Sequence, residues 1–228
     1  TEARAIRNTF PEMNSSEIPL AHPVSEEKIV YLLDPHGASR RSLGLRIADS
    51  AIRGLRWVLP YRRSALELPF TPPFLKKHGG LVMSIGQFMQ WVSNQVSSTG
   101  MVQIWPGTPV GEPILEGKQV VGVRIADQGV QKDGTPDVGY MPGMDVRARL
   151  TVVGDGPVGA VGQRLDEQFG LPEGHHQHDW AVGMKMVVNL PDHCDLVPGT
   201  VLHTLGYPEP EIFGFLYVHP ERIASLGI

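Results

Sequence analysis

Residues 151–165 read TVVGDGPVGAVGQRL, and this stretch decides whether the chain can adopt a dinucleotide-binding fold. Three glycines in it have the G-x-G-x-x-G spacing of a dinucleotide-binding turn: Gly154, Gly156 and Gly159. The apolar run at 146–153 predicts a strand before them, and the pattern over 157–169 predicts a helix after them. We therefore expect a strand–turn–helix unit.

The residues after the glycines do not complete a dinucleotide-binding unit. Such a unit needs a second parallel strand that ends, roughly 20 residues later, in an acid for the adenosine ribose. That distance falls on the polar stretch 172–179, and the first acid after the next predicted strand is Asp192. Two interpretations stay open. The glycines only shape a tight turn, or Asp155 holds a hydroxyl chain, as an Asp-Gly pair in many FAD enzymes holds the ribityl arm.

Composition narrows the class of protein. The chain has 228 residues, of which 41% are hydrophobic and 19% charged, as in soluble globular proteins of one or two domains. A net charge of −4 gives no reason to expect nucleic acid as a partner. The single cysteine, Cys194, excludes a disulfide framework or a cysteine-ligated cluster within these residues. Because the sequence starts at Thr1 and stops inside an apolar segment, we expect a piece of a longer protein.

Short apolar runs dominate the chain, so we expect an α/β fold of α+β character, with a mixed β-sheet and a few helices. A turn-rich connection is expected at 127–143 and a long helix at 78–99. The predicted division is 1–100, 101–170 and 171–228. Besides the strand before the glycines, strands are predicted at 26–34, 101–105, 110–116, 119–126, 181–190, 200–206 and 212–219.

The segment 40–63 is strongly basic, with seven arginines against one acid, Asp49. On a helix, Ile47, Ala51 and Leu55 would share an apolar face opposite the arginines. The apolar run LELPFTPPFL follows at 66–75. Such a segment suits the interface of an anionic membrane. The alternative is a surface helix that packs its apolar face on the core and exposes the arginines to water.

Six stretches, taken in order, resemble the electron-transfer flavoprotein:ubiquinone oxidoreductase family. The most specific is GVQKDGTP, which is similar to that family's Gly-(Ile/Val)-x-Lys-Asp-Gly-x-Pro connection. The six are PPFLKKHGGLVMSIGQFMQWVSNQV (72–96), GVQKDGTP (129–136), ARLTVVGDGPVGAVGQRL (148–165), AVGMK (181–185), HTLGYP (203–208) and FLY (215–217).

The resemblance implies an FAD flavoprotein that passes electrons from electron-transfer flavoprotein to a membrane quinone. In that family a dinucleotide-binding unit opens the FAD domain, a quinone-binding domain is inserted, and a 4Fe–4S domain follows. This chain would hold the quinone-binding region and the middle of the FAD domain, without the N-terminal nucleotide-binding unit or the cluster. It would lie peripherally on the cytoplasmic face of a bacterial membrane or on the inner mitochondrial membrane, and the isolated piece would be inactive.

Residue roles follow from the same resemblance. Asp155, with Gly154 and Gly156, would meet the ribityl side of FAD, and the helix that starts at Ser84 would bring Gly86 near the flavin. The quinone-binding residues would be Phe213, Gly214, Phe215 and Tyr217, although this strand has one glycine where the family has two. Because the chemistry is electron transfer between cofactors, no acid–base catalytic residue is expected.

Other candidates carry less weight. His175, His176, His178 and Asp179 could ligate a metal but suit a solvated loop. Cys194 suits a surface turn better than a nucleophile. Two further functions stay open, namely an FAD-dependent reductase of the geranylgeranyl-reductase type and a binding module without redox activity.

Overall fold

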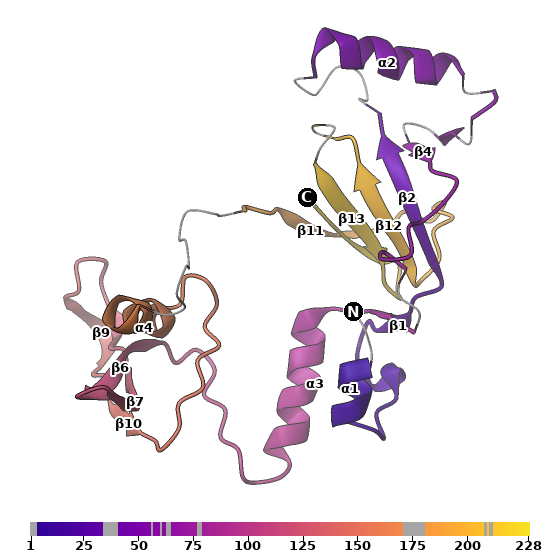
Figure 1. Ribbon diagram of the computed structural model, residues 1–228. Helices are drawn as coiled ribbons and strands as arrows, with labels where there is room; N and C mark the ends of the chain where they lie inside the picture. Colours follow the sequence, from indigo (N-terminus) through magenta and orange to yellow (C-terminus); the bar gives the residue numbers. More distant parts are fainter. Residues whose placement is uncertain are drawn as a thin grey trace. The chain divides into compact units, whose positions relative to one another are not determined.

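The computed structural model describes residues 4–33, 41–55, 57–59, 61–62, 65–76, 79–170, 181–207, 209 and 212–228 (Figure 1). The chain divides into two compact units. The first combines Thr1–Val102 with Val182–Ile228, and the second is Gln103–Ala181. The three-part division expected from the sequence stays a prediction.

A mixed sheet of seven strands forms the centre of the first unit, in the order β11-β14-β13-β12-β2-β4-β3. Only β2 and β12 pair in parallel among the described strands, and the other neighbours are antiparallel. This mixed architecture with few helices confirms the predicted fold class. The strands are β2 (Glu26–Leu32), β3 (Tyr61–Arg62), β4 (Ala65–Glu67), β11 (Lys185–Asn189), β12 (Thr200–Leu205), β13 (Phe213–Val218) and β14 (Ile223–Gly227).

A small helical cluster belongs to the same unit. Helix α3 (Ile85–Ser97) is capped by the hydroxyl of the preceding residue, Ser84. Trp91 on α3 packs edge-on against Phe10, with 5.1 Å between the ring centroids. Ile6, Leu81 and Met83 form the buried core of this cluster. The remaining elements are α1 (Arg4–Thr9), the 3-10 turn η1 (Ser15–Glu17) and the strand pair β1 (His22–Pro23) with β5 (Leu81–Val82).

Helix α2 (Leu43–Gly54) lies beyond the carboxyl end of β2 (Figure 1). It falls in the segment whose pattern predicted an amphipathic helix. The side chain of Arg41, just before the helix, connects it to the sheet by a 3.0 Å hydrogen bond to the carbonyl of Leu32.

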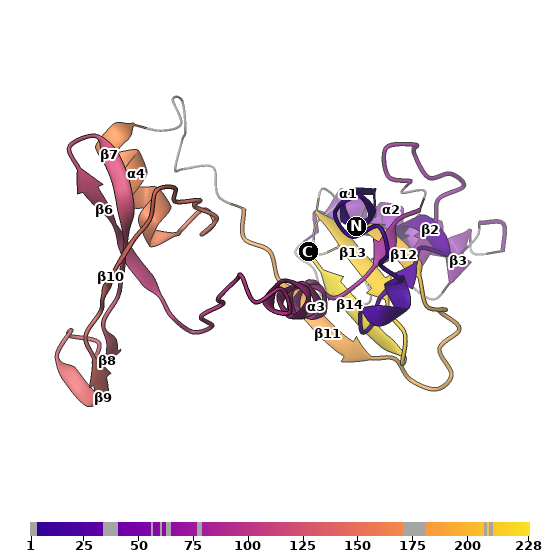
Figure 2. The ribbon, with the colours of Figure 1, turned by 90° about the horizontal axis from the view of Figure 1, so that it is seen from below.

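The second unit is built on a hairpin of β6 (Val110–Glu116) and β7 (Gln119–Ile125), extended by β10 (Asp145–Arg147). Gly117 in the hairpin turn has φ +63°, which a side chain disfavours, so the predicted Gly117-Lys118 turn is confirmed. Helix α4 (Ala160–Phe169) packs against β6 (Figure 2). A smaller hairpin, β8 (Gln128–Val130) with β9 (Pro136–Met141), stands where an irregular connection was expected.

Several predicted boundaries were wrong. The strand expected at 146–153 ends at Arg147, and 148–153 is irregular, with Val152 86% exposed. The segment 101–105 is irregular and exposed as well. No strand among the described residues pairs with 101–105 or with the chain beyond Ala148, whose N–H donates to the Val121 carbonyl. An extended chain needs a partner for its backbone groups. Helix α3 starts at Ile85 rather than 78, and β14 was not predicted at all.

Candidate functional site

The carboxylate of Asp155 turns back onto the start of α4. Its Oδ2 accepts hydrogen bonds from the backbone N–H groups of Val161, at 3.0 Å, and Gly162, at 3.1 Å. The N-cap residue of α4 is Gly159, which has no side chain of its own to accept these bonds. Asp155 therefore caps the helix from four residues upstream, and its negative charge suits the positive end of the helix dipole.

This arrangement explains two of the three glycines. Gly156 has φ +75°, a conformation that L side chains rarely adopt. A Cβ on Gly159 would overlap the carboxylate carbon of Asp155, so a side chain there would displace the carboxylate from its position on α4. Gly154 has neither constraint, because its φ is not positive and a Cβ would meet open space. Part of the G-x-G-x-x-G spacing is thus explained by the backbone turn at Gly156 and by the packing of Asp155 against Gly159.

Asp155 keeps acceptor capacity on its outer side. The residue is exposed, and both hydrogen bonds from α4 end on Oδ2. No hydrogen bond from the described residues ends on Oδ1, which can therefore accept bonds from a ligand hydroxyl. The capping role and the predicted ligand role use different oxygens of one carboxylate.

Ser84 and Gly86 lie at the first turn of α3, in the first unit. Ser84 Oγ accepts from the Gln87 N–H at 3.4 Å, and a Cβ on Gly86 would have only Ser84 Oγ near it, at 3.8 Å. Gly86 is therefore not required by packing inside this unit. The predicted flavin contacts of Ser84 and Gly86 stay predictions.

The predicted quinone strand is β13, near the middle of the seven-stranded sheet. Phe215 and Tyr217 stack with their ring centroids 4.6 Å apart, and Phe213 is half-exposed. A Cβ on Gly214 would come within 2.7 Å of the Gly227 carbonyl oxygen, so the glycine is needed for sheet packing. Burial, together with the negative charge of Glu27, raises the pKa of Tyr217 above its ordinary value of 10.0.

A polar pair beside these rings was missed by the sequence reasoning. His203 Nε2 on β12 lies 3.3 Å from Glu27 Oε1 on β2. The His203 ring also lies 5.9 Å, centroid to centroid, from that of Phe213. The two polar residues are 176 positions apart in the chain. Their pairing depends on the parallel contact of β2 with β12, which no local pattern signals.

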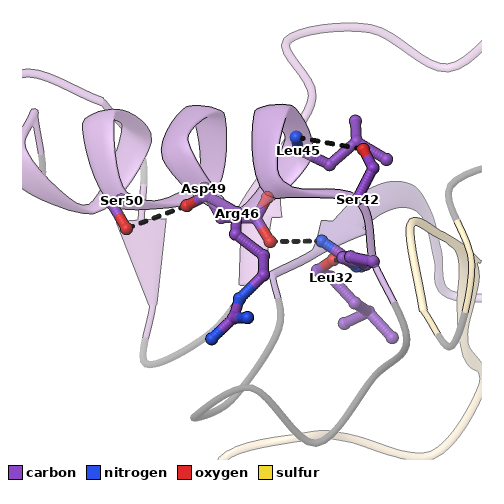
Figure 3. Close-up of polar contacts among 7 residues, drawn as sticks. Leu32, Ser42, Leu45, Arg46, Asp49 and Ser50 are labelled. Carbon is purple, nitrogen blue, oxygen red and sulfur yellow. Dashed lines mark hydrogen bonds and ion pairs between the residues drawn. The ribbon is translucent and has the colours of Figure 1, made fainter.

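Helix α2 is oriented opposite to an ordinary surface helix. Asp49 is buried and forms an ion pair with buried Arg41. Ser42 caps the helix by accepting a hydrogen bond from the Leu45 N–H, and Ser50 donates to the Arg46 carbonyl at 2.9 Å (Figure 3). Leu45, Ile52 and Leu59 are half-buried, whereas the other large apolar side chains of 43–59 are exposed. The exposed ones, called the α2 ridge below, are Leu43 (72%), Ile47 (63%), Leu55 (54%), Trp57 (87%) and Val58 (82%).

The surface-helix alternative from the sequence is therefore wrong, because the apolar face of α2 does not pack on the core. The orientation of α2 follows from the buried Arg41–Asp49 ion pair, which places the side of the helix that carries Asp49 towards the protein. Phe70 and Phe74, in the following apolar run, are also exposed. No helix among the described residues is long and apolar enough to cross a bilayer.

The remaining candidates contribute little. The histidine-rich loop with Asp179 lies outside the described residues. Elsewhere, in the part of the chain that the structure describes, no group of three or more His, Cys, Asp or Glu side chains could hold a metal ion. Cys194 is half-buried with a free thiol.

Comparison with known proteins shows the relationship of the chain. It is 34% identical, over 178 residues or 75% of its length, to the mitochondrial electron transfer flavoprotein-ubiquinone oxidoreductase of Arabidopsis thaliana. It is 28% identical, over 91% of its length, to the electron transfer flavoprotein-ubiquinone oxidoreductase of Pseudomonas aeruginosa. No family model matches the chain. Among solved structures, a myxobacterial FAD-dependent halogenase, CndH, matches 81% of this chain and 40% of its own, at 12% identity and a TM-score of 0.40.

By its sequence, the chain belongs to the flavoprotein–quinone oxidoreductases. It is a relative of the electron transfer flavoprotein-ubiquinone oxidoreductases and corresponds to a part of that family's sequence. It spans only 27% and 33% of the length of the two relatives above.

Proposed function

We propose that this chain is the quinone-binding region and the middle of the FAD domain of an electron-transfer flavoprotein dehydrogenase. Such an enzyme takes electrons from a reduced carrier flavoprotein and passes them through FAD to a membrane quinone. The single observation that carries the proposal is the relationship to oxidoreductases whose names give both partners, at 34% identity over 75% of the chain. The order of the six matching motifs supports it.

The Asp155 turn fits FAD. Its exposed carboxylate has one oxygen engaged on α4 and the other without a hydrogen bond from the described residues. The open space at Gly154 would let a ligand approach the backbone closely. We expect Asp155 to hold ribityl hydroxyls, with Gly154 and Gly156 beside them, and Ser84 and Gly86 to lie near the flavin. Bound FAD would supply the two-electron carrier that the side chains lack. A 4Fe–4S cluster would need cysteines beyond the one in this chain.

The aromatic strand β13 suits a quinone head group. Phe213, Phe215 and Tyr217 share one face of the strand, since they alternate along it, and Gly214 lies on the other face. The stacked Phe215 and Tyr217 rings and the half-exposed Phe213 ring give a flat apolar surface. Planar rings bind such surfaces by offset stacking.

The α2 ridge supports peripheral contact with a membrane. A quinone carries a long lipid tail, so its binding region must come close to a bilayer. The ridge presents five large apolar side chains to solvent, and Arg46 is exposed on the same helix. Apolar side chains flanked by arginines bind the interface of an anionic bilayer. This would place the protein on the cytoplasmic face of a bacterial membrane or on the inner mitochondrial membrane.

The quinone proposal is tested by calorimetric titration of the chain with decylubiquinone and, separately, with geranylgeraniol, which has an isoprenoid tail but no quinone ring. We expect decylubiquinone to bind and geranylgeraniol to bind at least tenfold more weakly, about 1.4 kcal/mol less. Equal or tighter binding of geranylgeraniol would favour the reductase alternative. Binding of neither would favour a module without redox activity.

The membrane proposal is tested by flotation with vesicles of phosphatidylcholine and phosphatidylglycerol at low salt. We expect the wild-type chain to float and the variant Leu43→Ser/Ile47→Ser/Trp57→Ser to lose most of its binding, since each buried apolar side chain contributes about 1.5–3 kcal/mol. The matched control is Val138→Ser/Met101→Ser, at two positions outside the α2 ridge that are 97% and 86% exposed. Equal loss in the control, or no flotation of the wild type, would contradict the role of the ridge.

A further inference from the structure

The sheet register brings Glu27 and His203 to the same face as the three predicted quinone-binding rings. Residues that pair across neighbouring strands project to the same side of a sheet. Val201 pairs with both Glu27 and Tyr217, and His203 pairs with Phe215. Phe213 lies two residues before Phe215 on the same strand. Glu27, His203 and the predicted quinone-binding rings therefore share one face.

Glu27 and His203 are largely withdrawn from water. The side chains of His203 and Glu27 are 11% and 10% exposed. Ile29 and Val201, their neighbours on the same face by register, are buried. A buried carboxylate is costly unless it is paired, and here the imidazole supplies that pairing through Nε2.

Glu27 also fixes which ring nitrogen of His203 is available. A carboxylate accepts only, so Nε2 carries the hydrogen that faces Glu27. Nδ1 has no hydrogen-bond partner among the described residues. In the protonated imidazole Nδ1 is a donor, and in the neutral imidazole it is an acceptor.

We propose that His203, oriented by Glu27, binds a ring oxygen of the quinone and discriminates between the oxidised and reduced forms of that ligand. This inference rests on the proposed function. The oxygens of an oxidised quinone only accept hydrogen bonds, so the oxidised ring binds the protonated form of His203. The hydroxyls of a quinol donate, so the reduced ring binds the neutral form.

Four other titratable groups share this face by register, namely Tyr31, Tyr217, His219 and Lys185. Both ring nitrogens of His219 are engaged, by the Leu20 carbonyl and by Ser225, and Lys185 lies on the edge strand β11. Tyr31 on β2 pairs with Leu205, which puts it on the same face, and Tyr217 lies on β13. The pKa of Tyr217 is raised by burial and by Glu27, so this phenol stays neutral at ordinary pH. Lys28, the next residue to Glu27, projects to the opposite face and pairs with Glu26 and Glu67.

The test compares binding of decylubiquinone and decylubiquinol to the chain between pH 5.5 and 8. In the wild type we expect the quinone affinity to fall about tenfold as the pH rises, because a hydrogen bond from a charged donor is lost. The quinol affinity is expected to rise over the same range. The variant His203→Gln should remove both trends. His219→Gln, on the same face, and the exposed His193→Gln are the matched controls and should keep them.

Glu27→Gln should weaken both trends, because an amide can donate as well as accept and no longer fixes the hydrogen on Nε2 of His203. If His203→Gln does not fold, the Nδ1 resonance of His203 in ¹⁵N-histidine-labelled wild type provides the readout, and it should shift when decylubiquinone is added. Binding with the same pH trends in wild type and His203→Gln, or an unchanged Nδ1 resonance, overturns this inference and leaves the proposed function standing. If neither ligand binds the wild type, both fail.

Discussion

At the scale of single residues, the turn at Asp155 shows how one side chain determines the identity of another. The carboxylate occupies the space that a Cβ at position 159 would need, and it accepts the hydrogen bonds of Val161 and Gly162 in return. A helix N-terminus without such an acceptor leaves backbone donors unsatisfied. The stability of α4 therefore depends on both residues.

Gly159→Ala should destabilise the second unit by about 1–3 kcal/mol, because the new methyl group displaces the carboxylate and removes the cap. Urea denaturation followed by circular dichroism measures this loss. Gly154→Ala is the matched control, and it should change stability by less than about 0.5 kcal/mol, because a Cβ there meets open space. Equal effects of the two substitutions would show that the turn is not packed in this way.

His219 gives a second prediction at this scale. Its ring is buried between the Leu20 carbonyl and Ser225. Burial lowers the pKa of His219 below its ordinary value of 6.5, and Lys185 acts in the same direction, whereas the hydrogen bond to Leu20 opposes them. The unfolded chain therefore binds this proton more readily than the folded chain does. Stability should fall as the pH drops below about 6.5 towards the lowered value.

The measurement is the thermal midpoint of unfolding between pH 7.5 and 5. The slope should be smaller in His219→Gln than in the wild type, and His193→Gln, on the exposed surface, should leave the slope unchanged. A wild-type slope that His219→Gln does not reduce would assign the acid sensitivity to another group.

At the scale of elements, α2 shows that an ion pair can determine which side of a helix faces the protein. Periodicity identifies two faces of α2 but does not say which one is buried. Asp49 and Arg41 decide this, because a buried carboxylate needs its partner, and the Leu32 carbonyl holds that partner at the end of β2. The apolar ridge is the consequence.

Arg41→Met should cost about 3–5 kcal/mol in the unfolding free energy of the first unit, since it leaves Asp49 buried without this cation. The double variant Arg41→Met/Asp49→Leu should recover part of the loss. Arg164→Met, which removes an exposed pair with Glu167, should cost less than about 0.5 kcal/mol. The interpretation fails if Arg41→Met behaves like Arg164→Met in chemical denaturation.

Sequence patterns predicted the elements that are locally determined. Strand β2 and the β6–β7 hairpin follow from apolar runs and a glycine turn, and they are found as predicted. Strand β14 was not predicted because its sequence, IASLG, has a weak strand propensity. Pairing with both β13 and β11 keeps it extended. The His203–Glu27 pair was not predicted either, because β2 and β12 are far apart in the sequence and become neighbours only in the folded sheet.

At the scale of the whole molecule, the two units contribute separate halves of the proposed chemistry. The aromatic strand, the His203–Glu27 pair and the α2 ridge belong to the first unit, and the Asp155 turn belongs to the second. We propose the turn as the acceptor for the ribityl side of FAD. In the sequence, the G-x-G-x-x-G at 154–159 is not followed, at the required distance, by a predicted strand that ends in an acid.

We therefore expect the purified chain to hold FAD weakly, with well under one flavin per molecule by its absorbance near 450 nm after gel filtration. Titration with added FAD should give weaker binding in Asp155→Ala than in the wild type. Asp137→Ala, at an exposed aspartate in the same unit, is the control. Stoichiometric flavin in the purified wild type would contradict the view that the adenosine-binding half is needed for tight binding.

The contact between Asp155 and Gly159 also has an evolutionary consequence. A chain that acquires a side chain at position 159 must give up the folded-back aspartate, and a chain that loses the aspartate no longer needs the glycine. The two positions should thus be inherited as a unit and change together, whereas Gly154 is free to vary unless a ligand constrains it. Substitution at Gly154 alone would then report selection by the ligand, separately from selection by the fold.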